Sequence, residues 1–373
     1  MKIAFVRRWD GKKENTWSGT PYGILSNLMI LKPNQIDEIP IEYNAIQKGI
    51  IRFIRGTNKF LSIDGCNYID NLIQEHIVSN SVKCDKQPII VFDECITKKI
   101  KNTYLFVDCS VDYALRSIVS GDEIGNYVPL RKKRSHSLIG IRHKRAMRFY
   151  KECKGIFTMG NWCAEDFINH TGIPAEKVHP VGGGINISEK EIDHSFKSGN
   201  KFLFVGKEFD RKNGPLVVEA FKILNQNNNG KYELYIAGPK EWPLSIDIPE
   251  GVHFLGRKNQ DELSKYYNLC DVFVMPSIFE AYGIVFAEAL IYGLPVIARN
   301  AFSMCDFITH GENGYLLNAN SAFELSELMD MAINNEEMRS KVIQDKEKYL
   351  LKYSWKTVAE KICKQIENDG YAI

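Results

Sequence analysis

Several patterns that mark common classes of protein are absent from this 373-residue sequence. Its nine cysteines include no Cys-x2-Cys pair, which argues against a zinc site, and scattered cysteines are typical of a reducing cytosol. Neither Asp-x-Asp nor Gly-x-Gly-x-x-Gly occurs, and no apolar run is long enough to span a bilayer. The apolar run at residues 3–6 is interrupted by Arg7 and Arg8, so no signal peptide is expected. The sequence therefore predicts neither a dinucleotide-dependent dehydrogenase nor an integral membrane protein.

Charge is nearly balanced, with 48 Lys and Arg residues against 46 Asp and Glu residues. One run, Arg131 to Arg148, is lopsided, because it opens with RKKR, contains no acid and includes His136 and His143. Two interpretations stay open: a solvated basic face, or contact with anionic lipid headgroups, to which each basic residue contributes about 1 kcal/mol. Each histidine belongs either to the surface or to a ligand-binding cleft. Nucleic-acid binding is not expected, since no recognition motif accompanies the run.

The chain length favours two domains built from alternating strands and helices. An apolar strand at residues 2–6 is followed by a polar loop that contains Gly19, and then by a helical pattern at residues 22–31. This order is typical of α/β units that hold a phosphate group. A plain strand-to-helix connection explains the same residues equally well.

Acidic residues follow two further expected strands of the first half. Asp93 and Glu94 come after residues 89–92, and Asp108 comes after residues 104–107. Ligands of open α/β sheets bind at the carboxyl ends of the strands. Asp108 is therefore either a residue of a ligand-binding site, which the resemblance described below makes the acceptor site, or a cap of the next helix.

The second half begins with a strand at residues 202–205, after a charged segment at 191–200 that is expected to be a hinge. Arg211 and Lys212 lie in the next loop, directly before a helix expected from Pro215. Two cations beside a helix N-terminus are electrostatically unfavourable, because the helix dipole is positive there. A bound anion would resolve this conflict, and the alternative is that both residues are ordinary surface cations.

The stretch from Cys270 to Ala298 is expected to form a strand, a turn, a helix, a turn and a strand. Glu280 lies in the turn and Glu288 in the helix, and their spacing of slightly over two helical turns predicts that both lean toward one crevice. The alternatives are a helix cap for Glu280 and a solvated helix face for Glu288. A helix N-terminus favours an anion by about 0.3–2 kcal/mol. Its backbone N–H groups here belong to Ala281, Tyr282, Gly283 and Ile284.

The Glu-x7-Glu pattern of Glu280 and Glu288, with the Arg211–Lys212 pair, resembles the retaining glycosyltransferases of the GT-B fold, family four. The resemblance is detailed over residues 202–366 and holds in outline over the first half. It implies an α/β fold with two Rossmann-like, doubly wound parallel-sheet domains that face a central cleft. The implied divisions are residues 1–190 for the acceptor, 191–200 as the hinge, 201–355 for the nucleotide sugar, and 356–373 as a helix that crosses back.

The resemblance also implies a role for each candidate residue. Arg211 and Lys212 would hold the donor phosphates, and with Glu280, which would bind the transferred sugar, they would form the catalytic group. Glu288 would accept hydrogen bonds from the ribose. Gly19 would face the diphosphate, and the turn of Gly256 and Arg257 would hold the nucleotide base.

The implied reaction is retaining transfer of a hexose-type sugar from a UDP- or GDP-sugar to a saccharide or lipid-linked acceptor, in the synthesis of cell-surface polysaccharide or glycolipid. The leaving phosphate would take the acceptor proton, and neither a metal nor another cofactor is expected, because cations and a helix dipole would replace the metal. The alternatives are an epimerase or hydrolase of the same fold, or a non-catalytic subunit that binds a nucleotide sugar. A cytoplasmic protein is expected, with the inner membrane face as a peripheral location if Arg131–Arg148 binds lipid.

Overall fold

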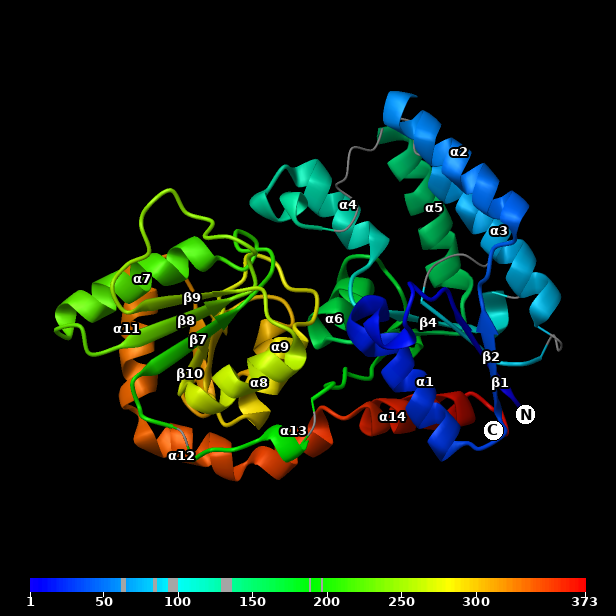
Figure 1. The fold of residues 1–373 in the computed structure, drawn as a ribbon. Coiled ribbons are helices and arrows are strands. Elements are labelled where there is room, and N and C mark those ends of the chain that lie inside the picture. Colours follow the sequence, from blue (N-terminus) through cyan, green and yellow to red (C-terminus); the bar gives the residue numbers. More distant parts are fainter. Residues whose placement is uncertain (62–64, 83–85, 93–99, 129–135, 188, 196) are drawn as a thin grey trace. The chain divides into compact units, whose positions relative to one another are not determined.

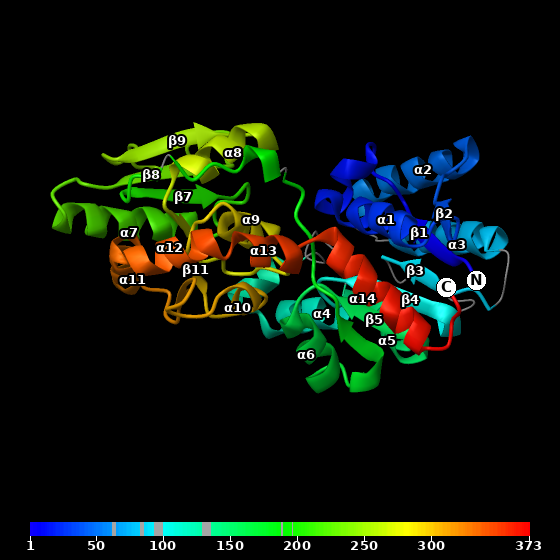
Figure 2. The same ribbon diagram turned by 90° about the horizontal axis from the view of Figure 1, so that it is seen from below.

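The chain divides into two compact units in the computed structural model, which describes residues 1–61, 65–82, 86–92, 100–128, 136–187, 189–195 and 197–373 (Figures 1 and 2). The first unit comprises Met1–Gly184 together with Trp355–Ile373, and the second comprises Ile185–Ser354. Each unit has its own six-stranded sheet in which neighbouring strands run parallel. The expected α/β architecture of two parallel-sheet domains is confirmed, and the central cleft between them stays a prediction.

The sheet of the first unit has the strand order β2-β1-β3-β4-β5-β6. Residues of β1, β3, β4 and β5 are almost all buried, as expected for strands that helices cover on both faces. The strands expected at residues 2–6, 89–92 and 104–107 correspond to β1, β3 and β4. The strands are β1 (Ile3–Arg7), β2 (Ile36–Pro40), β3 (Ile89–Val91), β4 (Thr103–Val107), β5 (Gly155–Thr158) and β6 (Val178–Pro180).

Helices supply the connections that parallel strands require. Those of the first unit are α1 (Thr20–Leu31), α2 (Ala45–Leu61), α3 (Gly65–Ser81), α4 (Val111–Ser120), α5 (His136–Glu152), α6 (Asn161–Asn169) and α14 (Trp355–Asn368), with 3-10 turns at Lys13–Gly19, Ile100–Asn102, Glu123–Asn126 and Ala175–Lys177. Among the described residues, no helix combines the length and apolar character needed to cross a bilayer.

The last helix, α14, belongs to the first unit although the second unit precedes it in the chain, and it lies along α1 (Figure 2). Two glycines make room for its first residue, Trp355: a Cβ at Gly23 or at Gly184 would lie 2.5 Å from the indole ring. Near the other end of α14, Lys32 pairs with Glu367 over 2.6 Å. Buried aromatic packing and a peripheral ion pair thus hold α14 on the first unit.

The sheet of the second unit has the order β12-β11-β10-β7-β8-β9, and α7 packs beside α11 on it (Figure 1). Its strands are β7 (Lys201–Val205), β8 (Glu233–Ala237), β9 (Val252–Gly256), β10 (Val272–Val274), β11 (Val296–Arg299) and β12 (Gly314–Leu317). Its helices are α7 (Gly214–Asn227), α8 (Gln260–Leu269), α9 (Ile284–Ile291), α10 (Met304–Phe307), α11 (Ala322–Asn334), α12 (Glu336–Gln344) and α13 (Lys346–Lys352), with a 3-10 turn at Glu189–Glu191.

The segment that joins the units is attached to the second one, so this unit begins at Ile185 rather than at residue 201. Ile185 N donates to the carbonyl oxygen of Tyr353 over 2.9 Å. Asn268 of α8 donates through Nδ2 to the carbonyl oxygen of Glu191 over 2.6 Å and accepts from the backbone N–H of Asp193 over 2.9 Å. These bonds explain why the expected boundary at 190 lies too late in the chain, and the hinge role of residues 191–200 stays a prediction.

Candidate functional site

Arg211, Lys212 and Glu280 meet at one edge of the sheet in the second unit. β7 and β10 are adjacent and parallel, so the loops that follow them leave the sheet at the same edge. The loop after β7 carries both cations, and the loop after β10 carries the carboxylate. The backbone N–H of Ile278 donates to the carbonyl oxygen of Arg211 over 2.9 Å, which joins the two loops directly.

The carboxylate of Glu280 is the centre of this cluster. The ammonium group of Lys212 pairs with Oε2 of Glu280, and the two side chains are 10% and 11% exposed. Arg211 Nη1 lies 3.4 Å from the same oxygen and donates to the carbonyl oxygen of Phe279 over 2.7 Å. Ser277 Oγ donates to Oε2 over 3.4 Å. All the contacts that the structure describes for this carboxylate go to Oε2, so Glu280 is tied to the cations rather than to a helix end.

The buried part of the cluster contains two cations and one carboxylate. Burial lowers the pKa of Lys212, because removal from water disfavours the ammonium form, although the carboxylate of Glu280 opposes this shift. A second carboxylate, that of Glu208, reaches Arg211 Nε over 2.7 Å but is 68% exposed. An anionic ligand could therefore replace Glu208 at low cost and would favour the charged form of Lys212.

Small and left-handed residues hold Lys212 in place. A Cβ at Gly206 would lie 2.7 Å from Cγ of Lys212, and a Cβ at Gly214 would lie 2.2 Å from an aromatic ring. Between them, Asn213 adopts the left-handed conformation at φ 58° and starts α7. Its Nδ2 donates to Oδ1 of Asn320 over 2.8 Å. Asn320 was not among the candidate residues, and no local pattern could have named it, because the contact spans more than a hundred positions.

The turn before α9 requires glycine at residue 283. Gly283 has φ 93°, and a Cβ there would lie 2.6 Å from the ring of Phe286 and 2.9 Å from Cγ of Glu280. As the N-cap residue it offers no side chain to the backbone N–H groups of the first turn. Ser303 Oγ fixes the same turn by donating to the carbonyl oxygen of Ala281 over 2.8 Å. Tyr282 is buried, with its ring centroid 5.0 Å from that of Phe307.

Glu288 lies in a separate, largely apolar environment on α9. Tyr267 donates its hydroxyl to Oε2 of Glu288 over 3.4 Å, and burial raises the pKa of this carboxyl to about 7. A freely solvated face does not describe this residue. Because α9 begins only at Ile284, helical periodicity does not relate Glu280 to Glu288, and their described contacts form two different sets. The expectation that their spacing alone aligns both carboxylates is thus not supported.

The turn of Gly256 and Arg257 ends β9 at the same carboxyl edge, since β9, β8 and β7 are consecutive parallel strands. Gly256 adopts φ 69°, and Arg257 is exposed to solvent. Their place in the sheet agrees with a site at this edge. Their role toward a nucleotide base stays a prediction.

Gly19 belongs to the first unit, whereas the other candidate residues belong to the second. It is the third of three consecutive residues with positive φ, after Trp17 at 45° and Ser18 at 54°, and α1 begins directly after it. Such a run is strained for non-glycine residues, and strain of this kind is common at functional sites. The role of Gly19 toward a diphosphate stays a prediction.

A network of charged residues in the first unit contains one of the candidate histidines. His143 Nε2 lies 2.7 Å from Oδ1 of Asp112, and Arg116 Nε donates to Oδ2 of Asp112 over 2.9 Å. Arg116 also pairs with Asp166 over 2.5 Å. Burial alone would raise the pKa of Asp112, but hydrogen bonds from His143 and Arg116 lower it. His143 therefore forms part of a half-buried structural network rather than a solvated surface.

Two further expectations for the first unit have different outcomes. The N-cap of α4 is Ser110, whose hydroxyl accepts from the backbone N–H of Tyr113 over 2.8 Å, so Asp108 is not that cap. Its acceptor-site role stays a prediction. Residues 131–135 of the basic run lie outside the described residues, as do Asp93, Glu94 and the side chain of His136.

Comparison with known proteins shows which family the second unit resembles. Residues 187–349 match the family described as "Glycosyl transferases group 1". An uncharacterized glycosyltransferase of Methanocaldococcus jannaschii is 26% identical over 232 residues, which cover 57% of this chain and 59% of that protein. The chain spans about half to three-fifths of the length of the curated relatives it matches first.

Solved structures extend the likeness over both units. WaaG, a glycosyltransferase involved in lipopolysaccharide biosynthesis, has a TM-score of 0.64 at 16% identity, over 98% of this chain and 99% of its own. HepE of Anabaena, solved in complex with UDP and glucose, has a TM-score of 0.60 at 12% identity, over 98% and 99%. At these identities the likeness shows the fold, which is GT-B. Residues 187–349, which lie in the second unit, are similar to the glycosyl transferase group 1 family.

Proposed function

We propose that this protein transfers a hexose-type sugar from a nucleotide sugar to a saccharide or lipid-linked acceptor, with retention of configuration at the anomeric carbon. The observation that carries the proposal is the buried pair of Lys212 and Glu280, with Arg211 beside it, at the carboxyl edge of a parallel sheet. Cations close to a helix N-terminus are the groups that bind a diphosphate. The similarity of residues 187–349 to the glycosyl transferase group 1 family supports a nucleotide-sugar donor.

Each residue of the cluster has a distinct proposed role. Lys212 and Arg211 hold the donor phosphates and stabilise the negative charge that builds on the departing diphosphate. Glu280 binds hydroxyl groups of the transferred sugar and favours positive charge at the anomeric carbon. Glu288, with its raised pKa, accepts hydrogen bonds from the ribose hydroxyls.

The proposed transfer needs neither a protein nucleophile nor a metal ion. The bond between the anomeric carbon and the phosphate oxygen breaks, and the acceptor oxygen bonds to the same face of the sugar. The departing phosphate oxygen takes the proton that the acceptor hydroxyl loses. The chain thus contributes charge stabilisation and orientation, which are the usual sources of catalysis in phosphate-leaving reactions.

Thermal unfolding with UDP, GDP, ADP and CMP in turn tests the donor site. A nucleotide at about a hundred times its dissociation constant should add about 2.7 kcal/mol to the free energy of unfolding. UDP is the first choice, because the HepE structure contains UDP and glucose. We expect one nucleotide to raise the melting temperature of the wild type and not that of Lys212→Ala. No shift with any of the four would contradict the proposed donor site.

Two other functions of the same fold make different predictions. An epimerase or hydrolase would consume the donor sugar in the absence of any acceptor. A non-catalytic subunit would bind the nucleotide and consume nothing. Following donor loss by chromatography, with and without added saccharide or lipid acceptors, separates the three. Acceptor-dependent consumption with retained anomeric configuration is the outcome that supports transfer.

Peripheral contact with an anionic membrane is proposed as well, and α2 supports it. Its residues Ala45–Leu61 include four cations and no acid. Ile46, Ile50 and Phe53 recur at helical spacing and are 75%, 43% and 73% exposed. An apolar stripe on a cationic helix is typical of helices that lie among lipid headgroups. In the expected run Arg131–Arg148, by contrast, Arg148 is paired with Glu152 over 2.9 Å.

Co-sedimentation with vesicles tests this surface. We expect binding to phosphatidylglycerol vesicles and weak binding to phosphatidylcholine vesicles. Ile46→Asn combined with Ile50→Asn should reduce binding, because the apolar stripe is lost, whereas Arg148→Ala serves as the control on α5. Equal binding of all variants would move the contact away from α2.

A further inference from the structure

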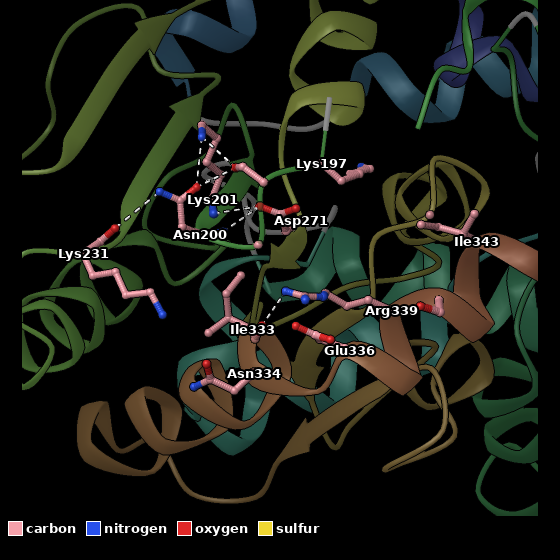
Figure 3. Close-up of a pocket in the computed structure, with 14 residues that line it drawn as sticks. Lys197, Asn200, Lys201, Lys231, Asp271, Ile333, Asn334, Glu336, Arg339 and Ile343 are labelled. Atoms are coloured by element: carbon pink, nitrogen blue, oxygen red, sulfur yellow. Dashed lines mark hydrogen bonds between the residues drawn. The ribbon is translucent and has the colours of Figure 1, made fainter. Parts of the chain in front are cut away.

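A hollow of about 700 Å³ lies at the other edge of the sheet in the second unit, away from the Lys212–Glu280 cluster (Figure 3). One wall is the segment Lys197–Lys201, which leads into β7, and the other comes from residues 333–343 of α11 and α12. Asp271, the residue before β10, lies between them. Since β7 and β10 are parallel, residues that precede them lie at the amino edge, whereas the cluster follows both strands. The hollow is therefore separate from the proposed donor site.

Cations dominate the lining of this hollow, which includes Lys197, Lys201, Lys231 and Arg339. Among the described residues, only Lys201 of these four lies within ion-pair distance of a carboxylate, 3.7 Å from Glu233. Lys231 Nζ lies over the ring of Tyr232, 5.1 Å from its centroid. Arg339 donates to the carbonyl oxygen of Ile333, which uses one of its five N–H groups.

The two acids of the lining do not cancel this charge. Asp271 is 2% exposed, and its Oδ2 accepts from the backbone N–H groups of Asn200 and Lys201 over 3.0 and 2.9 Å. Its charge is thus directed at the chain segment that enters β7. Glu336 lies exposed in the first turn of α12. Counted with Glu233, the partner of Lys201, four cations face three acids, which leaves one positive charge in excess around the hollow.

The hollow is built by close contacts between its two walls. Gly199 has φ 76°, and a Cβ there would lie only 3.3 Å from Nη1 of Arg339, so glycine lets the guanidinium lie against the turn. Lys197 Nζ is held by the carbonyl oxygens of Tyr267 and Cys270 over 2.8 and 2.5 Å. Burial lowers the pKa of Lys197 to about 8, and a nearby anion would oppose that shift. The planar guanidinium of Arg339, which lines the hollow, suits a phosphate group.

We infer that this hollow binds a small phosphate-bearing anion and acts as an effector site. Its volume lies within the range of about 300–1,000 Å³ that is typical of small-molecule pockets. Arg339 belongs to α12, and the segment Lys197–Lys201 leads from the first unit into β7. An anion that bridges the two would therefore tie this segment to α12. The site is thus placed to restrict the motion of the connecting segment. Only an effect of this restriction on turnover would rest on the proposed transfer function.

The test measures binding of inorganic pyrophosphate by calorimetry in the Lys212→Ala protein, in which the donor site is weakened. We expect binding to persist in that background and to weaken about tenfold or more when Ser340→Glu is added, because a carboxylate in the hollow repels the anion. Ser340 lines the hollow and is exposed, so this change introduces a carboxylate without removing a described contact. Arg339→Gln should weaken binding similarly. Lys265→Ala, an exposed lysine of α8 outside the hollow, is the matched control.

Three outcomes would overturn the inference: no binding in the Lys212→Ala background, binding that Ser340→Glu leaves unchanged, or equal weakening by Lys265→Ala. Inorganic phosphate and glucose 6-phosphate are measured in parallel, and tighter binding of the sugar phosphate assigns an organic ligand, whereas tighter pyrophosphate binding assigns an inorganic one.

Limited trypsin digestion supplies a readout that does not depend on activity. In the Lys212→Ala protein, pyrophosphate should slow cleavage after Lys197 and Lys201, and this protection should be lost with Ser340→Glu. Cleavage rates that do not change with pyrophosphate would show that the connecting segment is not tied by the anion. Failure of the proposed transfer function would leave both binding tests intact, so the two can fail separately.

Discussion

Each unit has a sheet of six parallel strands, but the strand orders differ and the two units use their charged residues differently. In the second unit, Arg211, Lys212 and Glu280 come from the loops after two adjacent strands and leave one buried positive charge in excess. In the first unit, Asp112 and Arg116 are matched by partners from other helices. The buried part of the cluster in the second unit thus has more cations than carboxylates, whereas Asp112, Arg116 and Asp166 of the first unit each have a partner on another helix. An anionic ligand can pair with the excess positive charge in the cluster of the second unit.

The directions of the pKa shifts express the same difference. Burial lowers the pKa of Lys212 and raises that of Glu288 to about 7, so both residues are disfavoured in their charged forms. Hydrogen bonds lower the pKa of Asp112, so its charged form is favoured by the folded first unit. Groups whose charged form is disfavoured by burial are common where ligands bind. Groups whose charged form is favoured in the folded protein stabilise the fold.

The largest expected effect comes from breaking the cluster of the second unit. Lys212→Ala should reduce turnover about 10²–10³-fold, because it removes the group that we propose stabilises the departing diphosphate. Glu280→Gln should also reduce turnover strongly, because Glu280 belongs to the same cluster. Steady-state rates with the nucleotide sugar identified by thermal unfolding measure both. The control is Lys222→Ala, an exposed lysine of α7. Near-normal turnover of Lys212→Ala at full donor occupancy would remove this residue from the mechanism.

The contributions of Glu288 in the second unit and Asp112 in the first unit to the free energy of unfolding should depend on pH with opposite signs. The pKa of Glu288 is raised from 4.5 to about 7 in the folded state, so the stability it contributes is present below pH 4.5 and is lost as the pH rises toward 7. The loss is at most about 3 kcal/mol. The pKa of Asp112 is lowered from 3.8, so its contribution is present above that pH and is lost only in more acid solution.

Denaturant unfolding across this range measures both effects. Glu288→Gln should flatten the fall in stability between pH 4.5 and 7. Asp112→Asn should destabilise the protein at pH 7, and its difference from the wild type should shrink as the pH falls below 3.8. A Glu288→Gln protein with the same pH slope as the wild type would contradict the burial of this carboxyl.

A paired glycine substitution should give a smaller effect, confined to the second unit. Gly283→Ala places a Cβ 2.6 Å from Phe286 and 2.9 Å from Cγ of Glu280 at a positive φ. Gly311→Ala has φ 82° but meets nothing within 4 Å, so it reports the backbone strain alone. Strain of this kind costs about 1 kcal/mol or more. We expect nucleotide affinity to fall about tenfold further in Gly283→Ala than in Gly311→Ala. Equal affinities would mean that the turn before α9 does not shape the site.

The second unit was the more predictable one because its signals are local. The strand before each loop, the glycines at Gly206 and Gly283 and the charged residues between them all lie within short stretches of sequence. The network around Asp112 could not be predicted, since its members come from different helices and no pattern relates them. For the same reason, the sequence predicted neither the hydrogen bond between Asn213 and Asn320 nor the hollow lined by Arg339 and Lys197.

Local signals also left gaps. The expectation that Glu280 and Glu288 lean toward one crevice stays a prediction, because Glu280 precedes the helix that begins at Ile284 and the described contacts of the two carboxylates differ. The first unit contains β2, α2 and α3, which were not anticipated, because residues 32–88 carry no motif that relates to chemistry. Sequence motifs therefore located the charged loops, whereas the distances between those loops could be learned only from the fold.

The smallest expected effect concerns Arg257, at the exposed rim of the carboxyl edge. An exposed cation contributes about 0–1 kcal/mol, so Arg257→Ala should raise the KM for the donor about two- to fivefold and leave kcat unchanged. Lys212→Ala should instead lower kcat, because Lys212 is buried against Glu280. The contrast separates residues that only position the nucleotide from residues that act on the departing phosphate. A fall in kcat with Arg257→Ala would place this residue near the reacting atoms and extend the cluster along β9, whereas an unchanged KM would return it to the solvent-facing turn.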